Sequence, residues 1–120
     1  MAKILFVDDD QILGQMYQMK FRSDGHEAEL AFDGDEALTK IHSFFPDIII
    51  LDILMPGKSG FEVLEILSNH PTFKQTPVVI LTYLSEEEHK NRALSLGAKE
   101  YFVKNNCTPE EVVSKVLSLI

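Results

Sequence analysis

Polar side chains suited to phosphoryl transfer stand directly after short apolar runs in this chain. Asp52 follows the run Ile48–Leu51 and precedes a Pro-Gly turn, so a carboxylate is delivered at the tip of a buried segment. A positioned aspartate can attack phosphorus and carry the phosphoryl group as an acyl phosphate. That reaction depends mainly on alignment and charge neutralisation. The other candidates follow further apolar runs and are Asp8, Asp9, Thr82 and Lys104.

These candidates together carry more negative than positive charge. Two carboxylates about 4 Å apart repel each other by roughly 4 kcal/mol at an effective dielectric constant of about 20. Lys104 supplies one positive charge, and Mg²⁺ would supply two while binding few carboxylates, several waters and a phosphate oxygen. We therefore expect Asp8 and Asp9 to hold Mg²⁺ directly or through water. Lys104 would pair with one phosphoryl oxygen, and Thr82 would donate a hydrogen bond to another.

The apolar runs predict the strands that position these side chains. Short runs of branched residues suit strands covered on both faces, as in parallel sheets, and ligands of such sheets bind beyond the carboxyl ends of the strands. A weaker strand of mixed polarity is expected at a sheet edge over Glu27–Phe32. Alternation of strand and helix along the chain predicts an α/β fold. The four strong runs are Ile4–Val7, Ile48–Leu51, Val78–Leu81 and Tyr101–Val103.

Apolar spacing and capping residues predict five helices between and after these strands. The first should span about Asp10–Ser23, with Asp10 as its cap and Ile12, Met16 and Met19 on its buried face. The second should follow Asp33–Asp35, and the third should open at Ser59–Gly60.

Two capping boxes predict where the last two helices begin. Ser85 with Glu88, and Thr108 with Glu111, both have the S/T-x-x-E spacing. The fourth helix should therefore start near Glu86 and the fifth near Pro109. Because the first half of the fourth helix is almost wholly polar, we expect this helix to be the less firmly anchored of the two.

Length and composition favour one domain, residues 1–120, in a reducing compartment. A net charge of −8 disfavours direct binding to nucleic acid or to an anionic membrane surface. We find neither a leader-like segment nor an apolar run of about 18 residues that would cross a membrane. The single cysteine, Cys107, has no partner for an internal disulfide. The cytoplasm is the expected location.

The motifs taken together resemble the receiver domain of two-component response regulators over essentially the whole chain. The likeness rests on the acidic pair after Phe6-Val7, the stretch from Pro46 to Gly57 around Asp52, Leu81-Thr82, and Phe102-Val103-Lys104. Thr82 follows Asp52 by 30 positions and Lys104 follows Thr82 by 22, spacings that are also similar to those of the family. The combination is far more specific than any single motif.

This resemblance implies a fold, an acceptor and a metal site. The fold would be flavodoxin-like, a three-layer (βα)₅ sandwich with parallel strand order 2-1-3-4-5. Asp52 would accept a phosphoryl group from a histidine kinase, a phosphotransfer protein or a small acyl phosphate. Mg²⁺ would bind Asp9, Asp52 and the backbone carbonyl of Leu54 directly, and Asp8 through water. The domain would be a stoichiometric phosphoacceptor that catalyses its own phosphorylation and dephosphorylation, and not a turnover enzyme.

The resemblance also implies a switch and its partners. The Thr82 hydroxyl would move toward the phosphoryl group while Tyr101 turns inward. The face formed by the fourth helix, the fifth strand and the fifth helix would then change, and it would contact a downstream target or an attached output domain. A homodimer through this face is a further option, but we identify no exposed apolar patch in the sequence that supports it.

The chain departs from the usual receiver pattern at three places. One of them is the apolar pair Leu54 and Leu84, two residues beyond Asp52 and Thr82, which we expect to shield an acyl phosphate from water. Asn105 follows Lys104 where receivers usually have a proline in a cis peptide, and a cis bond without proline costs about 2.5–4 kcal/mol. Tyr83 follows Thr82 where receivers usually have a small residue. We expect a different loop after Lys104 and a more crowded entrance to Asp52.

Two other functions remain open from the sequence alone. A Mg²⁺-dependent phosphatase with an aspartyl nucleophile would use Asp8 and Asp10 as a D-x-D pair, but it would leave Asp52 idle, and Ile12 stands where such enzymes have Thr or Val. A receiver-shaped interaction module that is never phosphorylated, with access blocked by Tyr83, is the second. Mg²⁺ binding without acyl phosphate formation would favour that module.

Overall fold

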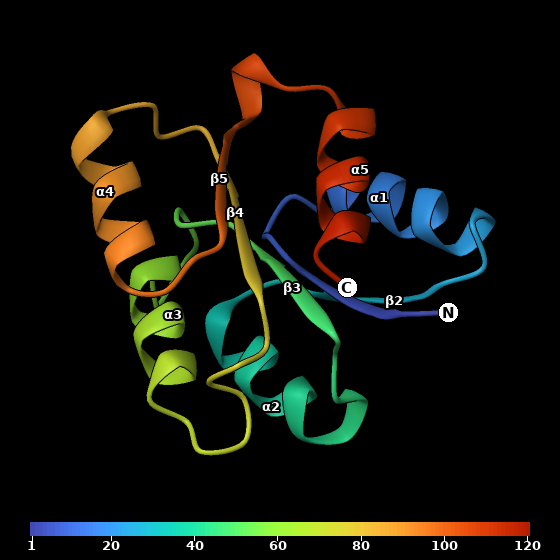
Figure 1. Ribbon diagram of the computed structural model, residues 1–120, viewed down its shortest axis with the longest axis horizontal. Helices are drawn as coiled ribbons and strands as arrows, with labels where there is room; N and C mark the ends of the chain where they lie inside the picture. Colours follow the sequence, from blue (N-terminus) through green and yellow to red (C-terminus); the bar gives the residue numbers. More distant parts are fainter.

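The computed structural model describes all 120 residues and contains one sheet of five parallel strands (Figure 1). The spatial order of the strands is β2-β1-β3-β4-β5, which confirms the predicted order. The weakly patterned strand β2 lies at an edge of the sheet, as expected. The strands are β1 (Lys3–Val7), β2 (Glu27–Ala31), β3 (Ile48–Leu51), β4 (Val78–Thr82) and β5 (Glu100–Val103).

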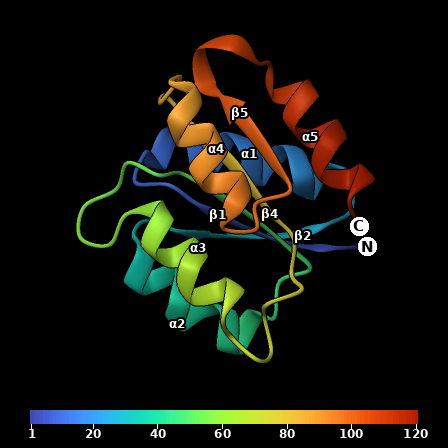
Figure 2. The same ribbon diagram turned by 60° about the vertical axis from the view of Figure 1, so that its left-hand side comes forward.

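Helices cover both faces of the sheet. Helices α2, α3 and α4 lie on one face, and α1 and α5 lie on the other (Figures 1 and 2). The helices are α1 (Gln11–Ser23), α2 (Gly34–Phe44), α3 (Gly60–Ser68), α4 (Glu87–Ser95) and α5 (Pro109–Ser118). None of them combines the length and the apolar character that crossing a bilayer requires.

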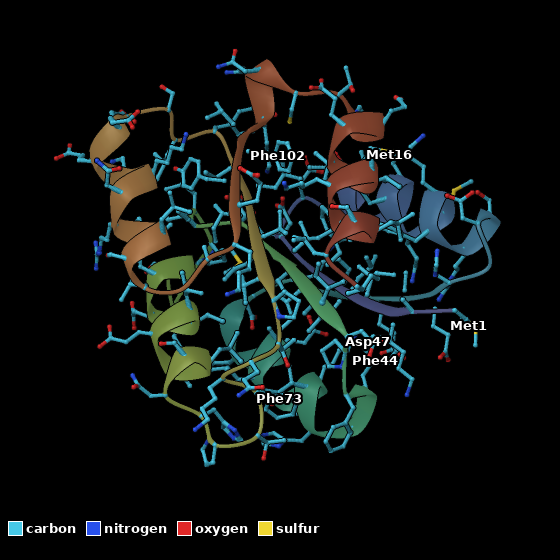
Figure 3. All side chains as sticks on the ribbon, in the orientation of Figure 1. Met1, Met16, Phe44, Asp47, Phe73 and Phe102 are labelled. Carbon is cyan, nitrogen blue, oxygen red and sulfur yellow. The ribbon has the colours of Figure 1, made fainter.

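Successive strand side chains point alternately into two separate hydrophobic cores, one on each face of the sheet. This explains why the strands are apolar throughout. On β1, Leu5 and Val7 point into the core beneath α2, α3 and α4, whereas Ile4 and Phe6 point into the core beneath α1 and α5. Met16 and Phe102, labelled in Figure 3, pack at the border of this second core. The double covering buries the central strands β3 and β4 completely up to the carboxyl edge of the sheet.

Helix α1 is correctly predicted in extent but wrongly in orientation. Ile12 and Met19 are 82% and 71% exposed, and Met16 is only half-buried. The buried side chains are instead Tyr17 and Phe21. Tyr17 stacks on Phe6 of β1 with ring centroids 4.9 Å apart and on Phe21 with centroids 6.5 Å apart. This aromatic pair at spacing i, i+4 buries more area than the Ile-Met stripe, so it decides the face.

The predicted caps are right for α5 and wrong for α4. Thr108 and Glu111 form the reciprocal capping box, and Pro109 is the first residue of α5. Helix α4 starts at Glu87, and its N-cap residue Glu86 makes no side-chain cap hydrogen bond. The Ser85 amide donates instead to the Glu86 carboxylate, which replaces the expected capping box. Because Ala93 is the only buried residue of α4, its predicted weak anchoring is confirmed.

Gly60 lets the start of α3 approach the end of β3 closely. A Cβ atom at this position would lie 2.3 Å from the Asp52 carbonyl oxygen and 2.7 Å from the Ile53 Cα. The Gly60 amide also donates a 2.9 Å hydrogen bond to the Ile53 carbonyl. Any side chain here would have to displace backbone next to Asp52, so glycine fixes where that aspartate lies.

Replacement of Gly60 should therefore be far more costly than replacement of another buried glycine. We expect Gly60→Ala to lower the free energy of unfolding by about 2–3 kcal/mol, because the clash is with backbone and cannot be relieved by rotating a side chain. Gly14→Ala in α1 is the matched control: its Cβ would meet the Leu30 side chain at an ordinary 3.4 Å, so its effect should stay within about 1 kcal/mol. Urea denaturation measures both, and equal effects would contradict the close-approach explanation.

Candidate phosphoryl site at the carboxyl edge of the sheet

Backbone hydrogen bonds between neighbouring strands bring the candidate residues to one edge. The Asp52 amide donates to the Val7 carbonyl at 2.9 Å, and the Asp8 amide donates to the Ala31 carbonyl at 3.0 Å. Asp8 and Asp52 therefore follow directly on paired strand residues. Thr82 ends β4, and Lys104 follows β5, so the two remaining candidates reach the same edge from the adjoining strands (Figure 1).

Lys104 binds both buried carboxylates of the site. Its Nζ atom lies 2.8 Å from Asp8 Oδ2 and 3.2 Å from Asp52 Oδ2. The side chains of Lys104, Asp8 and Asp52 are only 7%, 1% and 5% exposed. Ionised groups this deeply buried need a partner of opposite charge, and one ammonium group serves two carboxylates here.

Backbone amides orient the other oxygen of each carboxylate. Asp52 Oδ1 accepts hydrogen bonds from the amides of Ile53 at 2.7 Å and Leu54 at 3.2 Å. Asp8 Oδ1 accepts one from the Asp10 amide at 2.9 Å. Asp10 itself faces away from this network, because its carboxylate accepts from the Leu13 amide and caps α1. The D-x-D pair that a phosphatase would need is therefore not formed.

Burial and charge shift the pKa values of Asp8 and Lys104 in the same direction. Burial raises the pKa of Asp8, although the contacts with Lys104 and the Asp10 amide oppose it. Burial alone would lower the pKa of Lys104, but its contacts with Asp8 and Asp52 outweigh that effect and raise it. Lys104 thus remains charged at neutral pH, while the charge on Asp8 is only partly compensated.

The acidic cluster fits a small divalent cation. Asp8, Asp9 and Asp52 each bring one carboxylate oxygen within 4.8 Å of the others. Asp8 Oδ2 is sealed from solvent and makes no well-aligned hydrogen bond despite its contact with Lys104. Asp9 is exposed, so the carboxylate cluster is shielded from solvent at Asp8 and Asp52 and accessible to solvent at Asp9. An all-oxygen set with room for water is the kind that Mg²⁺ prefers.

Thr82 and Tyr101 meet the backbone of the same residue, Leu84. Thr82 is fully buried, and its Oγ1 accepts from the Leu84 amide at 3.4 Å. Tyr101 is 7% exposed, and its hydroxyl donates to the Leu84 carbonyl at 2.8 Å. The loop after β4 is therefore linked to the site through Thr82 and to β5 through Tyr101. Tyr101 already lies in the inward orientation.

The structure shows the surroundings of Asn105 and Tyr83, which differ from the residues usual in receivers. No cis peptide bond is present, and Lys104–Asn106 form a short 3₁₀ turn after β5, so the Lys104-Asn105 bond is trans. Tyr83 is half exposed, and the centre of its ring lies 4.8 Å from Lys104 Nζ. Neither this contact nor the close approach of Gly60 was predicted from the sequence, and the expected crowding of the entrance to Asp52 by Tyr83 stays a prediction.

Comparisons with known proteins agree on one family. The family model of the response regulator receiver domain matches residues 4–117. The phosphate regulon transcriptional regulatory protein PhoB of Rhizobium meliloti is 34% identical over 110 residues, which are 92% of this chain and 48% of PhoB. The response regulator PleD of Caulobacter vibrioides is 36% identical over 103 residues, which are 86% of this chain and 23% of PleD. The chain thus spans about half, or less, of the curated relatives that it matches.

Solved structures are similar over nearly the whole chain. The receiver domain of the Francisella response regulator 1452 has a TM-score of 0.91 and 34% sequence identity, covering 99% of this chain and 96% of that one. The chemotaxis protein CheY4 of Vibrio cholerae also has a TM-score of 0.91 and 34% identity, covering 100% and 99%. The fold, the acidic cluster and all three comparisons lead to one conclusion: the chain belongs to the family of response regulator receiver domains.

Proposed function

We propose that this receiver domain accepts one phosphoryl group on Asp52 and thereby changes the face formed by α4, β5 and α5. The observation that carries the proposal is the set of contacts that the Asp52 carboxylate makes. Two backbone amides hold its Oδ1, and its Oδ2 lies beside a buried ammonium group. Such a carboxylate is oriented for attack, and the ammonium group beside it can bind an oxygen of the incoming phosphoryl group.

The donor would be a phosphohistidine of a histidine kinase or phosphotransfer protein, or a small acyl phosphate. An oxygen of Asp52 bonds to phosphorus while the bond from phosphorus to the donor's nitrogen or oxygen breaks, and the donor leaves with that electron pair. Attack of water on the phosphorus of the resulting acyl phosphate releases inorganic phosphate and restores the carboxylate. The reaction is stoichiometric in each cycle, as the family's role as phosphoacceptor module requires.

Each remaining site residue has a use in this transfer. Lys104 would keep its place beside Asp52 and pair with a phosphoryl oxygen, and Thr82 would donate its hydroxyl hydrogen to another. Asp9, Asp52 and the Leu54 carbonyl would hold Mg²⁺ directly, with Asp8 acting through water. When bound, Mg²⁺ would neutralise charge on the phosphoryl oxygens. Two observations support this assignment: the mutual proximity of the three carboxylates and the poorly satisfied Asp8 Oδ2.

The loop after β4 would carry the change to the surface. A phosphoryl group adds a charge of about −1.5 to −2, and one of its oxygens would accept the hydrogen of the Thr82 hydroxyl, whose oxygen accepts a long 3.4 Å hydrogen bond from the Leu84 amide. Movement of Thr82 would free Leu84 and the start of α4, a helix with one buried residue and no side-chain cap. Tyr101, which is already buried, would keep its bond to the Leu84 carbonyl and so transmit the movement of the loop to β5. The altered face would receive a target, an output domain or a second copy of the chain.

Acceptance of the phosphoryl group by Asp52 is testable by intact mass. After incubation with acetyl phosphate, the wild type should gain one phosphate with Mg²⁺ and almost none without it, while Asp52→Asn should gain none under either condition. Asp24→Asn, which changes an exposed aspartate at the end of α1, should behave as the wild type. An equal adduct on Asp52→Asn would contradict the proposal. So would the absence of any adduct on a folded wild type that binds Mg²⁺, the result expected of an unphosphorylated module.

The proposed switch is testable through Tyr101. Tyr101→Phe removes the hydroxyl bond to Leu84, which should cost about 1 kcal/mol and change the balance of the two loop conformations about fivefold. Amide NMR shifts on phosphorylation should concentrate in residues 82–103 of the wild type and be clearly smaller in this variant. Tyr17→Phe, on the opposite face of the sheet, is the control. Identical shift patterns in all three proteins would rule out a role of Tyr101.

A further inference from the structure

The Lys104 ammonium has a third neighbour besides its two carboxylates. The centre of the Tyr83 ring lies 4.8 Å from Lys104 Nζ, with the ammonium group over the face of the ring. Cations within about 6 Å of an aromatic centre are attracted by the negative face of the ring. The ammonium group therefore lies between Asp8 and Asp52 on one side and a tyrosine face on another.

Burial makes this contact more effective than a surface one. The Lys104 side chain is 7% exposed, whereas Tyr83 is 55% exposed. Tyr83 thus presents part of its surface to solvent and a ring face to the lysine, which is largely removed from water. Cation–π attraction grows when the cation is desolvated, so the ring contributes to holding the ammonium group where it is.

The surroundings of Tyr83 offer the lysine few other partners. Tyr83 and Lys104 line a hollow of about 130 Å³ beside the site. Its other lining residues are mainly apolar: Leu13, Tyr17, Leu81, Cys107 and Pro109. A lysine that leaned into this hollow would lose both carboxylates and gain no opposite charge. The Tyr83 ring face is thus a cation-stabilising group on this side of the ammonium.

We propose that Tyr83 is a positioning residue for Lys104, whose ring face holds the ammonium group in place to meet the phosphoryl oxygen. This inference rests on the proposed phosphorylation of Asp52 and adds a residue to that reaction. Tyr83 acts through Lys104 and touches no reacting atom. Tyr83 also lies between Thr82 and Leu84 in the chain. Movement of the loop after β4 would therefore displace the Tyr83 ring and change its contact with Lys104.

Three substitutions separate the ring face from the size of the side chain. Tyr83→Phe keeps an aromatic face, Tyr83→Leu keeps apolar bulk without one, and Tyr83→Ala removes both. We expect Phe to retain the wild-type rate of Asp52 phosphorylation by acetyl phosphate, and Leu and Ala both to lower it about two- to fivefold. If Ala instead accelerated the reaction while Leu matched the wild type, Tyr83 would be a steric barrier only, and the inference would be overturned. Equal rates in all four proteins would overturn it as well.

A second readout needs no phosphorylation. Protons on the Lys104 methylene group next to Nζ should show an upfield ring-current shift in the NMR spectra of the wild type and Tyr83→Phe, and should lose it in Tyr83→Leu. If the wild type takes no phosphate although this shift is present, the proposed function fails while the contact stands. If the wild type is phosphorylated and the shift is absent, the contact fails while the proposed function stands.

Discussion

Repulsion between buried carboxylates, relieved by a single lysine, is the interaction on which this site depends. Asp8 and Asp52 are nearly inaccessible to solvent and share the Lys104 ammonium at 2.8 and 3.2 Å. Burial raises the pKa of Asp8 even with that partner beside it, so one positive charge does not fully compensate the cluster. A site in that condition gains from a divalent cation, and a phosphoryl group brought in with the cation supplies new partners for the lysine.

The fold holds this unfavourable cluster together chiefly through the positions of its backbone. Paired strand ends place Asp8 and Asp52 side by side, and Gly60 lets α3 pack against the carbonyl of Asp52 without a side chain between them. The other side of the site is built differently. The loop after β4 is linked to the site and to β5 by two hydrogen bonds to Leu84, and α4 beyond it buries one residue. A rigid carboxylate cluster beside a weakly anchored helix is the arrangement that the proposed switch requires.

The sequence predicted the parts of this arrangement that depend on local pattern. Apolar runs identified the strands, and the polar residues at their ends identified the site, because parallel strands present their carboxyl ends at one edge. The orientation of α1 was wrong because the aromatic partner that decides it, Phe6, lies on another element. The Ser85 cap was wrong because the neighbouring Glu86 carboxylate competes for the amide. The Tyr83–Lys104 contact joins the ends of β4 and β5, and no local pattern encodes the distance between them.

The most direct test of the central claim is to locate the phosphoryl group chemically. An acyl phosphate on aspartate is reduced by borohydride to homoserine, which tandem mass spectrometry of the digested protein identifies by position. After incubation with acetyl phosphate and Mg²⁺, the account predicts reduction at position 52 and at no other aspartate. Reduction at position 8 or 9, or a phosphate adduct that resists borohydride altogether, would contradict it.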